Sequence, residues 1–83
     1  LHIDGLNDGA TLARAPNSEH GVRLQLRALG SEQVVDWLLD GRWIAQTHGA
    51  QLMQREFAEP GAHTLTALAT DGAWTQVRFN VLR

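Results

Sequence analysis

The 83-residue sequence contains no cysteine and no lysine, and it has no long apolar segment. Without cysteine, the chain can form neither a disulfide framework nor a thiolate metal site. No segment approaches the roughly 20 consecutive apolar residues that a membrane span needs. We therefore expect a domain that folds without disulfides and does not insert directly into a membrane.

A strong charge of either sign is also missing. The net charge of −2 arises from nine acidic residues and seven arginines, and it offers no electrostatic attraction for nucleic acid or an anionic membrane surface. The length predicts one small domain over residues 1–83, with a single core and a stability of about 5 kcal/mol. Because the first residue is Leu1 and not methionine, we expect this domain to be excised from a longer protein.

Among the patterns that are present, the clearest is a hairpin centred on Asp40 and Gly41. This dipeptide suits a type I′ turn, in which both central residues need a positive φ and glycine supplies one without a Cβ penalty. The apolar run at 34–39 precedes it and is typical of a core strand. A two-residue loop places Leu38 opposite Trp43, and directly opposed residues share one face of a sheet.

The same register places Trp37 opposite Ile44, on the other face of the sheet. Side chains alternate between the two faces along each strand, so one assignment fixes the rest. We expect the core to contain Val35, Trp37 and Ile44. We expect the outer face to carry Asp36, Leu38 and Trp43.

Alternation of apolar and polar residues predicts strands along most of the chain. The strands are expected near 1–4, 22–28, 34–39, 42–46, 51–57, 62–70 and 74–82, with a brief return to the sheet at 10–13. Residues 14–21 are polar and contain Pro16, which predicts a loop. This spacing indicates an all-β fold, an immunoglobulin-like sandwich of about seven short antiparallel strands.

Residues 51–58 leave the phase of their strand open. Either Leu52 faces inward or Met53 and Phe57 do, and a helical turn is an alternative because several of these residues are good helix formers. We favour a strand that ends at Phe57. A type II turn at 59–61 should follow, with proline at its second position and a positive-φ glycine at its third.

The last two strands predict a second hairpin, and the pattern of its faces determines the loop length. A two-residue loop of Asp71 and Gly72 would set inward residues opposite outward ones. A three-residue loop at 71–73 with a bulge keeps both apolar faces on one side. In that register Leu68 and Trp74 face outward. The expected pairs are Ala67 with Val77, Leu65 with Phe79, and His63 with Val81.

Residues able to carry chemistry are scattered. The four histidines are His2, His20, His48 and His63. No two of them have a spacing typical of metal ligands, so we expect no metal site. His63 follows a Pro-Gly turn, where sandwich domains often place a corner tyrosine, so we expect a structural corner role. Ser18 and Ser31 lack a nucleophile elbow, and no glycine-rich phosphate loop occurs. We predict no enzyme activity and no cofactor.

A surface patch is the main functional prediction. In a sandwich the two hairpins usually belong to one sheet, so four apolar side chains could converge on its outer face: Leu38, Trp43, Leu68 and Trp74. The polar rim of this candidate binding patch would consist of Asp36, Gln76 and Arg78. The alternative is that either indole folds over a sheet edge and caps the core.

Four segments carry a resemblance to a known family. They are Ile-Asp-Gly-Leu-Asn-Asp-Gly-Ala at 3–10, Asp-Trp-Leu-Leu-Asp-Gly at 36–41, Glu-Pro-Gly-Ala-His-Thr-Leu-Thr at 59–66, and Asp-Gly at 71–72 before Val-Arg-Phe-Asn-Val. Together they resemble the C-terminal domain of penicillin-binding protein 1C. The resemblance implies a parent enzyme of peptidoglycan assembly that is anchored in the bacterial inner membrane and has glycosyltransferase and transpeptidase domains.

That resemblance implies a non-catalytic C-terminal domain in the periplasm. The transpeptidase motifs Ser-x-x-Lys, Ser-x-Asn and Lys-Thr-Gly are missing from these residues, so no catalytic residue carries over. We predict a docking module whose partner is the parent transpeptidase domain or a periplasmic cell-wall protein. The alternatives are a carbohydrate-binding module for peptidoglycan strands and a structural spacer.

Overall fold

The computed structural model describes residues 1–13 and 21–82, and every regular element in this part of the chain is a β-strand. The strands are β1 (His2–Asp4), β2 (Ala10–Leu12), β3 (Val22–Leu29), β4 (Val34–Leu39), β5 (Arg42–His48), β6 (Met53–Phe57), β7 (Gly61–Ala69) and β8 (Trp74–Val81). The predicted loop at 14–21, with Ser18 and His20, lies outside the described residues except for Gly21.

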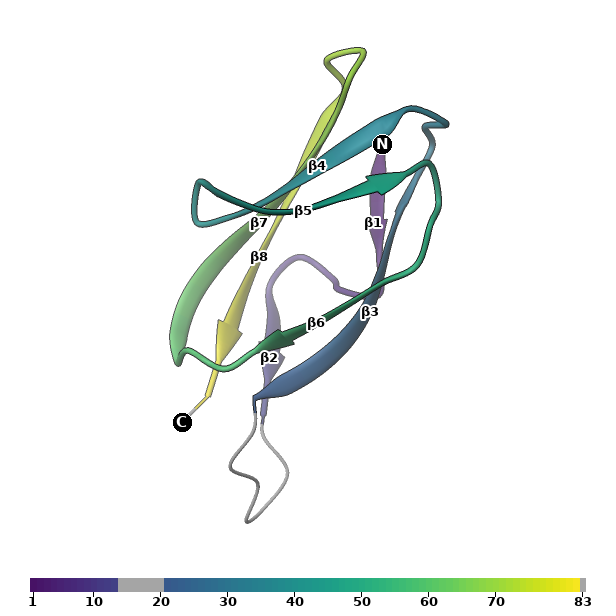
Figure 1. Ribbon diagram of the computed structural model, residues 1–83. Helices are drawn as coiled ribbons and strands as arrows, with labels where there is room; N and C mark the ends of the chain where they lie inside the picture. Colours follow the sequence, from purple (N-terminus) through teal and green to yellow (C-terminus); the bar gives the residue numbers. More distant parts are fainter. Residues whose placement is uncertain (14–20, 83) are drawn as a thin grey trace.

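Two sheets pack face to face, as Figure 1 shows. The smaller has the order β1-β3-β6, and the larger has the order β2-β8-β7-β4-β5. The predicted all-β immunoglobulin-like sandwich is therefore confirmed, with eight strands in the described residues in place of about seven. The additional strand arises because the N-terminal segment switches sheets: β1 pairs with β3, whereas β2 pairs with β8 and runs parallel to it.

The core lies between the inner faces of the two sheets. Its largest fully buried side chain is Trp37, whose indole Nε1–H donates to the buried Thr47 hydroxyl at 2.9 Å. The rings of Phe57 and Phe79 meet edge to face, with centroids 5.1 Å apart. A buried indole N–H needs such a partner because an unpaired donor costs about 1–3 kcal/mol.

The β4–β5 hairpin has the predicted turn, and its register changes beyond that turn. Asp40 and Gly41 have φ angles of 53° and 83°, as a type I′ turn requires, and Leu38 lies opposite Trp43. The predicted pairing of Trp37 with Ile44 is wrong, because a β-bulge sets Trp37 opposite Ala45. Ile44 is the extra residue of the bulge and is only partly buried, although it packs against the core.

The bulge reverses the facing of every later residue in β5. Without it, Gln46 would point into the core and Thr47 would point to solvent. With it, Gln46 is exposed, and Thr47 is buried where it can accept the Trp37 hydrogen bond. The strand also extends to His48, two residues further than predicted.

The β7–β8 hairpin has the predicted odd loop length but a register shifted by two residues. The loop consists of Thr70, Asp71 and Gly72, because the Ala69 amide donates to the Ala73 carbonyl at 2.8 Å. The predicted pairs are wrong: Ala67 lies opposite Thr75, Leu65 opposite Val77, and His63 opposite Phe79. A shift of two residues preserves the facing of each side chain, so Leu68 and Trp74 still point outward.

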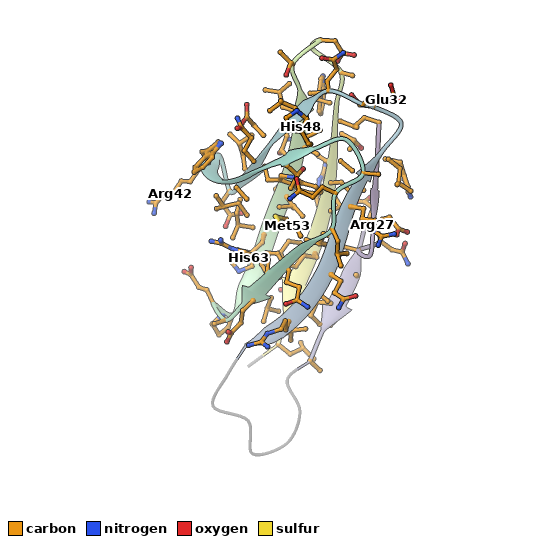
Figure 2. The ribbon with its side chains drawn as sticks, turned by 45° about the vertical axis from the view of Figure 1, so that its right-hand side comes forward. Arg27, Glu32, Arg42, His48, Met53 and His63 are labelled. Atoms are coloured by element: carbon orange, nitrogen blue, oxygen red, sulfur yellow. The ribbon has the colours of Figure 1, made fainter. Side chains whose placement is uncertain are left out.

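Strand β6 resolves the phase that the sequence left open. Met53 and Phe57 are buried, whereas the Leu52 side chain is 43% exposed. Figure 2 shows Met53 between the sheets, while Arg27 points away from the sandwich on the outer side of β3. The favoured strand ending at Phe57 is confirmed, and Gly61 has the positive φ expected after Pro60, 111°.

Candidate binding face

The outer face of the five-stranded sheet brings the predicted patch residues together in two rows. Backbone pairing across β5, β4, β7 and β8 defines the rows: the first contains Trp43, Leu38, Thr66 and Gln76, and the second contains Gln46, Asp36, Leu68 and Trp74. We call these eight residues the tryptophan face. Residues paired in this way lie about 4.5–5.5 Å apart between Cβ atoms, so the rows form a continuous surface.

Both outer tryptophans expose most of their surface to solvent. Trp43 is 61% exposed, Trp74 is 62% exposed and Leu68 is 39% exposed. A ring folded over the sheet edge to cap the core would be largely buried. The capping alternative therefore does not describe either indole, and the four apolar side chains share the outer face.

The two indoles occupy diagonal corners of the tryptophan face. Trp43 lies on β5 in the first row and Trp74 on β8 in the second row. Three interstrand spacings and one step along the strand separate their Cα atoms by about 16 Å. Leu38 and Leu68 lie between them along the diagonal, so the apolar surface is a stripe with polar residues on each side.

A hydrogen-bond network holds the Trp43 indole. Its Nε1–H donates to Asp36 Oδ1 at 3.0 Å, and the Gln46 amide donates to the same oxygen at 3.0 Å. The hydrogen bond from Trp43, and to a smaller extent that from Gln46, lowers the pKa of Asp36 below its ordinary value. Asp36 is therefore ionised at neutral pH. Its hydrogen bond holds the N–H edge of the exposed Trp43 ring in place.

Trp74 is held differently. Its indole N–H has no hydrogen-bond partner among the residues that the structure describes, and the ring borders a shallow groove of about 580 Å³. The groove is lined by Leu38, Asp40, Gly41, Thr64, Thr66, Leu68, Trp74 and Gln76. On its floor the Gln76 side chain donates to the Thr66 hydroxyl at 3.1 Å. The groove thus combines apolar walls with hydroxyl and amide groups.

One end of the groove is secured by a clamp between Asp40 and β7. The Asp40 amide donates to the Thr64 carbonyl at 2.8 Å, and the Thr64 amide donates to Asp40 Oδ1 at 2.8 Å. Asp40 Oδ2 lies 2.6 Å from Nδ1 of the buried His63, whose Nε2 lies 2.7 Å from the Glu59 carbonyl oxygen. The Asp40 carboxylate thereby continues the β4–β7 ladder beyond the last backbone pair.

The geometry of the clamp requires a protonated His63. The Glu59 carbonyl can only accept, so Nε2 donates, and an ionised Asp40 requires Nδ1 to donate as well. The hydrogen bond to Asp40 raises the pKa of His63, against the opposing effect of burial. Burial acts to raise the pKa of Asp40, but the hydrogen bonds from His63 and Thr64 outweigh it and lower that pKa.

Six of the seven predicted patch residues belong to the tryptophan face. The seventh, Arg78, lies on the same side of the sheet but one row further, opposite Thr64. Its backbone amide donates to Asp8 Oδ1 at 2.8 Å, which joins the N-terminal loop to β8. As predicted, His63 is a corner residue that bonds back to the backbone, but its partnership with Asp40 was not foreseen.

Two of the eight residues of the tryptophan face, Gln46 and Thr66, were not identified from the sequence, nor was the role of Asp40 at the end of the groove. Gln46 was not recognised because the predicted register lacks the bulge, and only the bulge sets Gln46 opposite Asp36 on the outer face. The Asp40 carboxylate was interpreted only as a turn residue. Its pairing with His63, 23 residues away, depends on the packing of two separate hairpins and leaves no local pattern.

Two kinds of feature are absent from the described ranges 1–13 and 21–82. No group of three or more His, Cys, Asp or Glu side chains in these ranges is arranged to hold a metal ion. The same ranges contain no helix with the length and apolar character needed to cross a membrane.

Comparison with known proteins gives two similarities. Residues 1–79 match the model of a family described as the Penicillin-Binding Protein C-terminus Family. Among solved structures, the chain is similar to the fibronectin(III)-like modules of Clostridium thermocellum CbhA, with 18% sequence identity, a TM-score of 0.56 and coverage of 98% of this chain and 97% of that one. At this identity the likeness concerns the fold alone. No sequence among curated proteins matches significantly.

Proposed function

Because the chain belongs to the penicillin-binding protein C-terminus family, we propose that it is a non-catalytic docking module of a periplasmic peptidoglycan synthase and that it binds through the tryptophan face. Its partner would be the transpeptidase domain of the parent enzyme or another cell-wall protein. In this role the module positions the parent enzyme on its partner, and the parent supplies the catalytic groups.

The observation that carries this proposal is the exposure of two indoles and Leu68 on one sheet face. Contiguous apolar patches on a soluble domain mark interaction sites, and tryptophan is among the residues that contribute most to interfaces. The fold does not need these side chains outside, because Trp37, Phe57 and Phe79 already fill the core. Their exposure is therefore better explained by binding than by stability.

A second candidate function is binding of peptidoglycan strands. It is favoured by the side chains that share the groove with Trp74, since Thr64, Thr66 and Gln76 could bond sugar hydroxyls while the indole stacks on a ring. The protein-docking role is preferred because the apolar stripe through Leu38 and Leu68 adds surface that a polyhydroxyl ligand would leave poorly matched.

The test is binding of the 83-residue chain to two purified probes, the transpeptidase domain of the parent and isolated sacculi. Docking predicts saturable binding to the domain that the double variant Trp43→Ala, Trp74→Ala loses. The matched control is Arg23→Ala, Arg27→Ala, which changes the outer side of β3 on the opposite sheet and should bind normally. Retention on sacculi alone would favour the glycan function, and no binding to either would favour a spacer.

A further inference from the structure

Asp36 is the only ionisable side chain among the eight residues of the tryptophan face. It lies in the second row, with Gln46 on one side and Leu68 on the other. Among the described residues the ion pair that forms is between His63 and Asp40, so Asp36 has no cationic partner. Its negative charge is therefore uncompensated at the side of the apolar stripe, next to Leu68.

The hydrogen bonds to Asp36 leave one of its oxygens available. Trp43 and Gln46 both donate to Oδ1, whereas Oδ2 accepts no bond from the described residues. Trp43 is 61% exposed even though its N–H edge is held against the carboxylate. A cation is attracted both by a carboxylate oxygen and by the face of an indole, and here the two attractions converge.

The other charges near the face do not offset this one. The carboxylate of Asp40, at the end of the groove, is neutralised by His63 and also lies near Arg42. Figure 2 shows Arg42 extending from the β4–β5 turn away from the sheets. Arg78 is one row beyond Gln76. A neutral occupant would remove water from the Asp36 carboxylate without offering a charged partner in its place. Desolvating an unpaired carboxylate in this way is unfavourable.

We propose that the tryptophan face docks a protein segment that presents an arginine between apolar side chains. The arginine would stack its guanidinium on the ring face of Trp43 while it bonds Asp36 Oδ2. Its apolar neighbours would cover Leu38, Leu68 and the Trp74 groove. Arginine fits better than lysine because its planar group can stack on the indole while it bonds the carboxylate. The proposal rests on the docking function and specifies the chemistry of the partner.

The test uses two tripeptide probes, acetyl-Leu-Arg-Leu-amide and its citrulline counterpart, which has nearly the same shape but no charge. Nuclear magnetic resonance would follow the indole N–H signals of Trp43 and Trp74 in the 83-residue chain. We expect the arginine peptide to shift both signals and to bind about tenfold more tightly than the citrulline peptide. Added salt should reduce this difference.

The variant Asp36→Asn retains an acceptor for Trp43 and removes the charge, so it should bind both peptides equally and weakly. The matched control is Asp4→Asn, which removes one negative charge from an exposed position on the opposite sheet and should bind like the parent chain. Near-UV circular dichroism would establish that both variants are folded.

Equal binding of the two peptides, no binding of either, or an Asp36→Asn variant that keeps the arginine preference would each overturn the proposal. Binding of chitotetraose that shifts the Trp74 signal and is unaffected by Asp36→Asn would overturn it in favour of a glycan. These outcomes are distinct from failure of the docking function, which is judged by whether the transpeptidase domain binds and requires Trp43 and Trp74.

Discussion

The two faces of the five-stranded sheet use the same chemistry for different ends. On the inner face the indole of Trp37 donates to Thr47, and on the outer face the indole of Trp43 donates to Asp36, at 2.9 Å and 3.0 Å. Trp37 is fully buried, whereas Trp43 is 61% exposed. Water can replace the outer bond but not the inner one. The same contact should therefore support folding on one side and orient an exposed indole on the other.

The largest effect should come from the inner tryptophan. Trp37→Ala should lower the free energy of unfolding by about 3–5 kcal/mol, because it removes the largest buried side chain and leaves a cavity. That loss is comparable to the whole stability of a domain of this size. Thermal melting and near-UV circular dichroism should show an unfolded chain at ordinary temperature. A variant that melts like the parent would refute the central role of Trp37.

A smaller effect should separate the two indole hydrogen bonds directly. Thr47→Val keeps the shape of the side chain and leaves the Trp37 N–H unpaired in the core, which should cost about 1–3 kcal/mol. Asp36→Ala removes the acceptor of Trp43, but water can take its place, so the stability of the domain should stay close to that of the parent chain. Urea denaturation would measure both, and equal losses would break the contrast between the faces.

The clamp at the groove end should make stability depend on pH. The pKa of His63 is raised above its ordinary 6.5, so the clamp contributes fully below that value and is lost as pH rises through the folded-state pKa. The pKa of Asp40 is lowered from 3.8, so its contribution is present above that value and is lost as pH falls through the folded-state pKa. Maximum stabilisation from the clamp should therefore lie between these two ordinary values.

Melting temperatures measured from about pH 5 to about pH 9 would check this dependence. The parent chain should lose stability toward alkaline pH, and His63→Gln should show a flatter profile because it cannot carry the charge. His48→Gln is the matched control, since His48 is exposed and no ionic partner for it exists among the described residues. Identical profiles for the parent and His63→Gln would show that the clamp does not cause the pH dependence of stability.

The outer tryptophans should also have only a small effect on folding. The double variant Trp43→Ala, Trp74→Ala should change the free energy of unfolding by no more than about 0.5 kcal/mol per site, because both rings are mostly exposed. Its melting temperature should stay close to that of the parent chain even though binding is lost. A melting temperature near that of Trp37→Ala would show that the outer rings support the fold after all.

The facing of residues was more predictable from sequence than their pairing. In β7 and β8 the register was wrong by two residues, yet Leu68 and Trp74 were placed correctly because facing repeats every second residue. In β5 an error of one residue mattered, because the bulge at Ile44 turns Gln46 to the outer face and Thr47 to the inner face, the reverse of a regular register. Bulges respond to packing across the sandwich, and a local pattern does not encode that packing.

In the candidate site, too, the features set by local sequence could be predicted, and those set by packing between hairpins could not. The positions of Leu38 and Trp43 followed from a two-residue turn whose chemistry is local. The clamp of Asp40 and His63 did not, because it forms only when the β4–β5 turn packs against β7. The diagonal arrangement of the indoles likewise depends on β4 lying beside β7, which is a matter of topology.

The bulge at Ile44 also changes what one edge of the larger sheet offers to a second copy of the molecule. Strand β5 is one of the two edge strands of the larger sheet, and a flat edge strand is a template for pairing with a strand of another chain. A bulge bends and twists such an edge and leaves a residue that cannot join a regular ladder. Copies of this domain held at high density on one surface would thus resist edge-to-edge aggregation, even while each exposes an adhesive apolar stripe on the adjoining face.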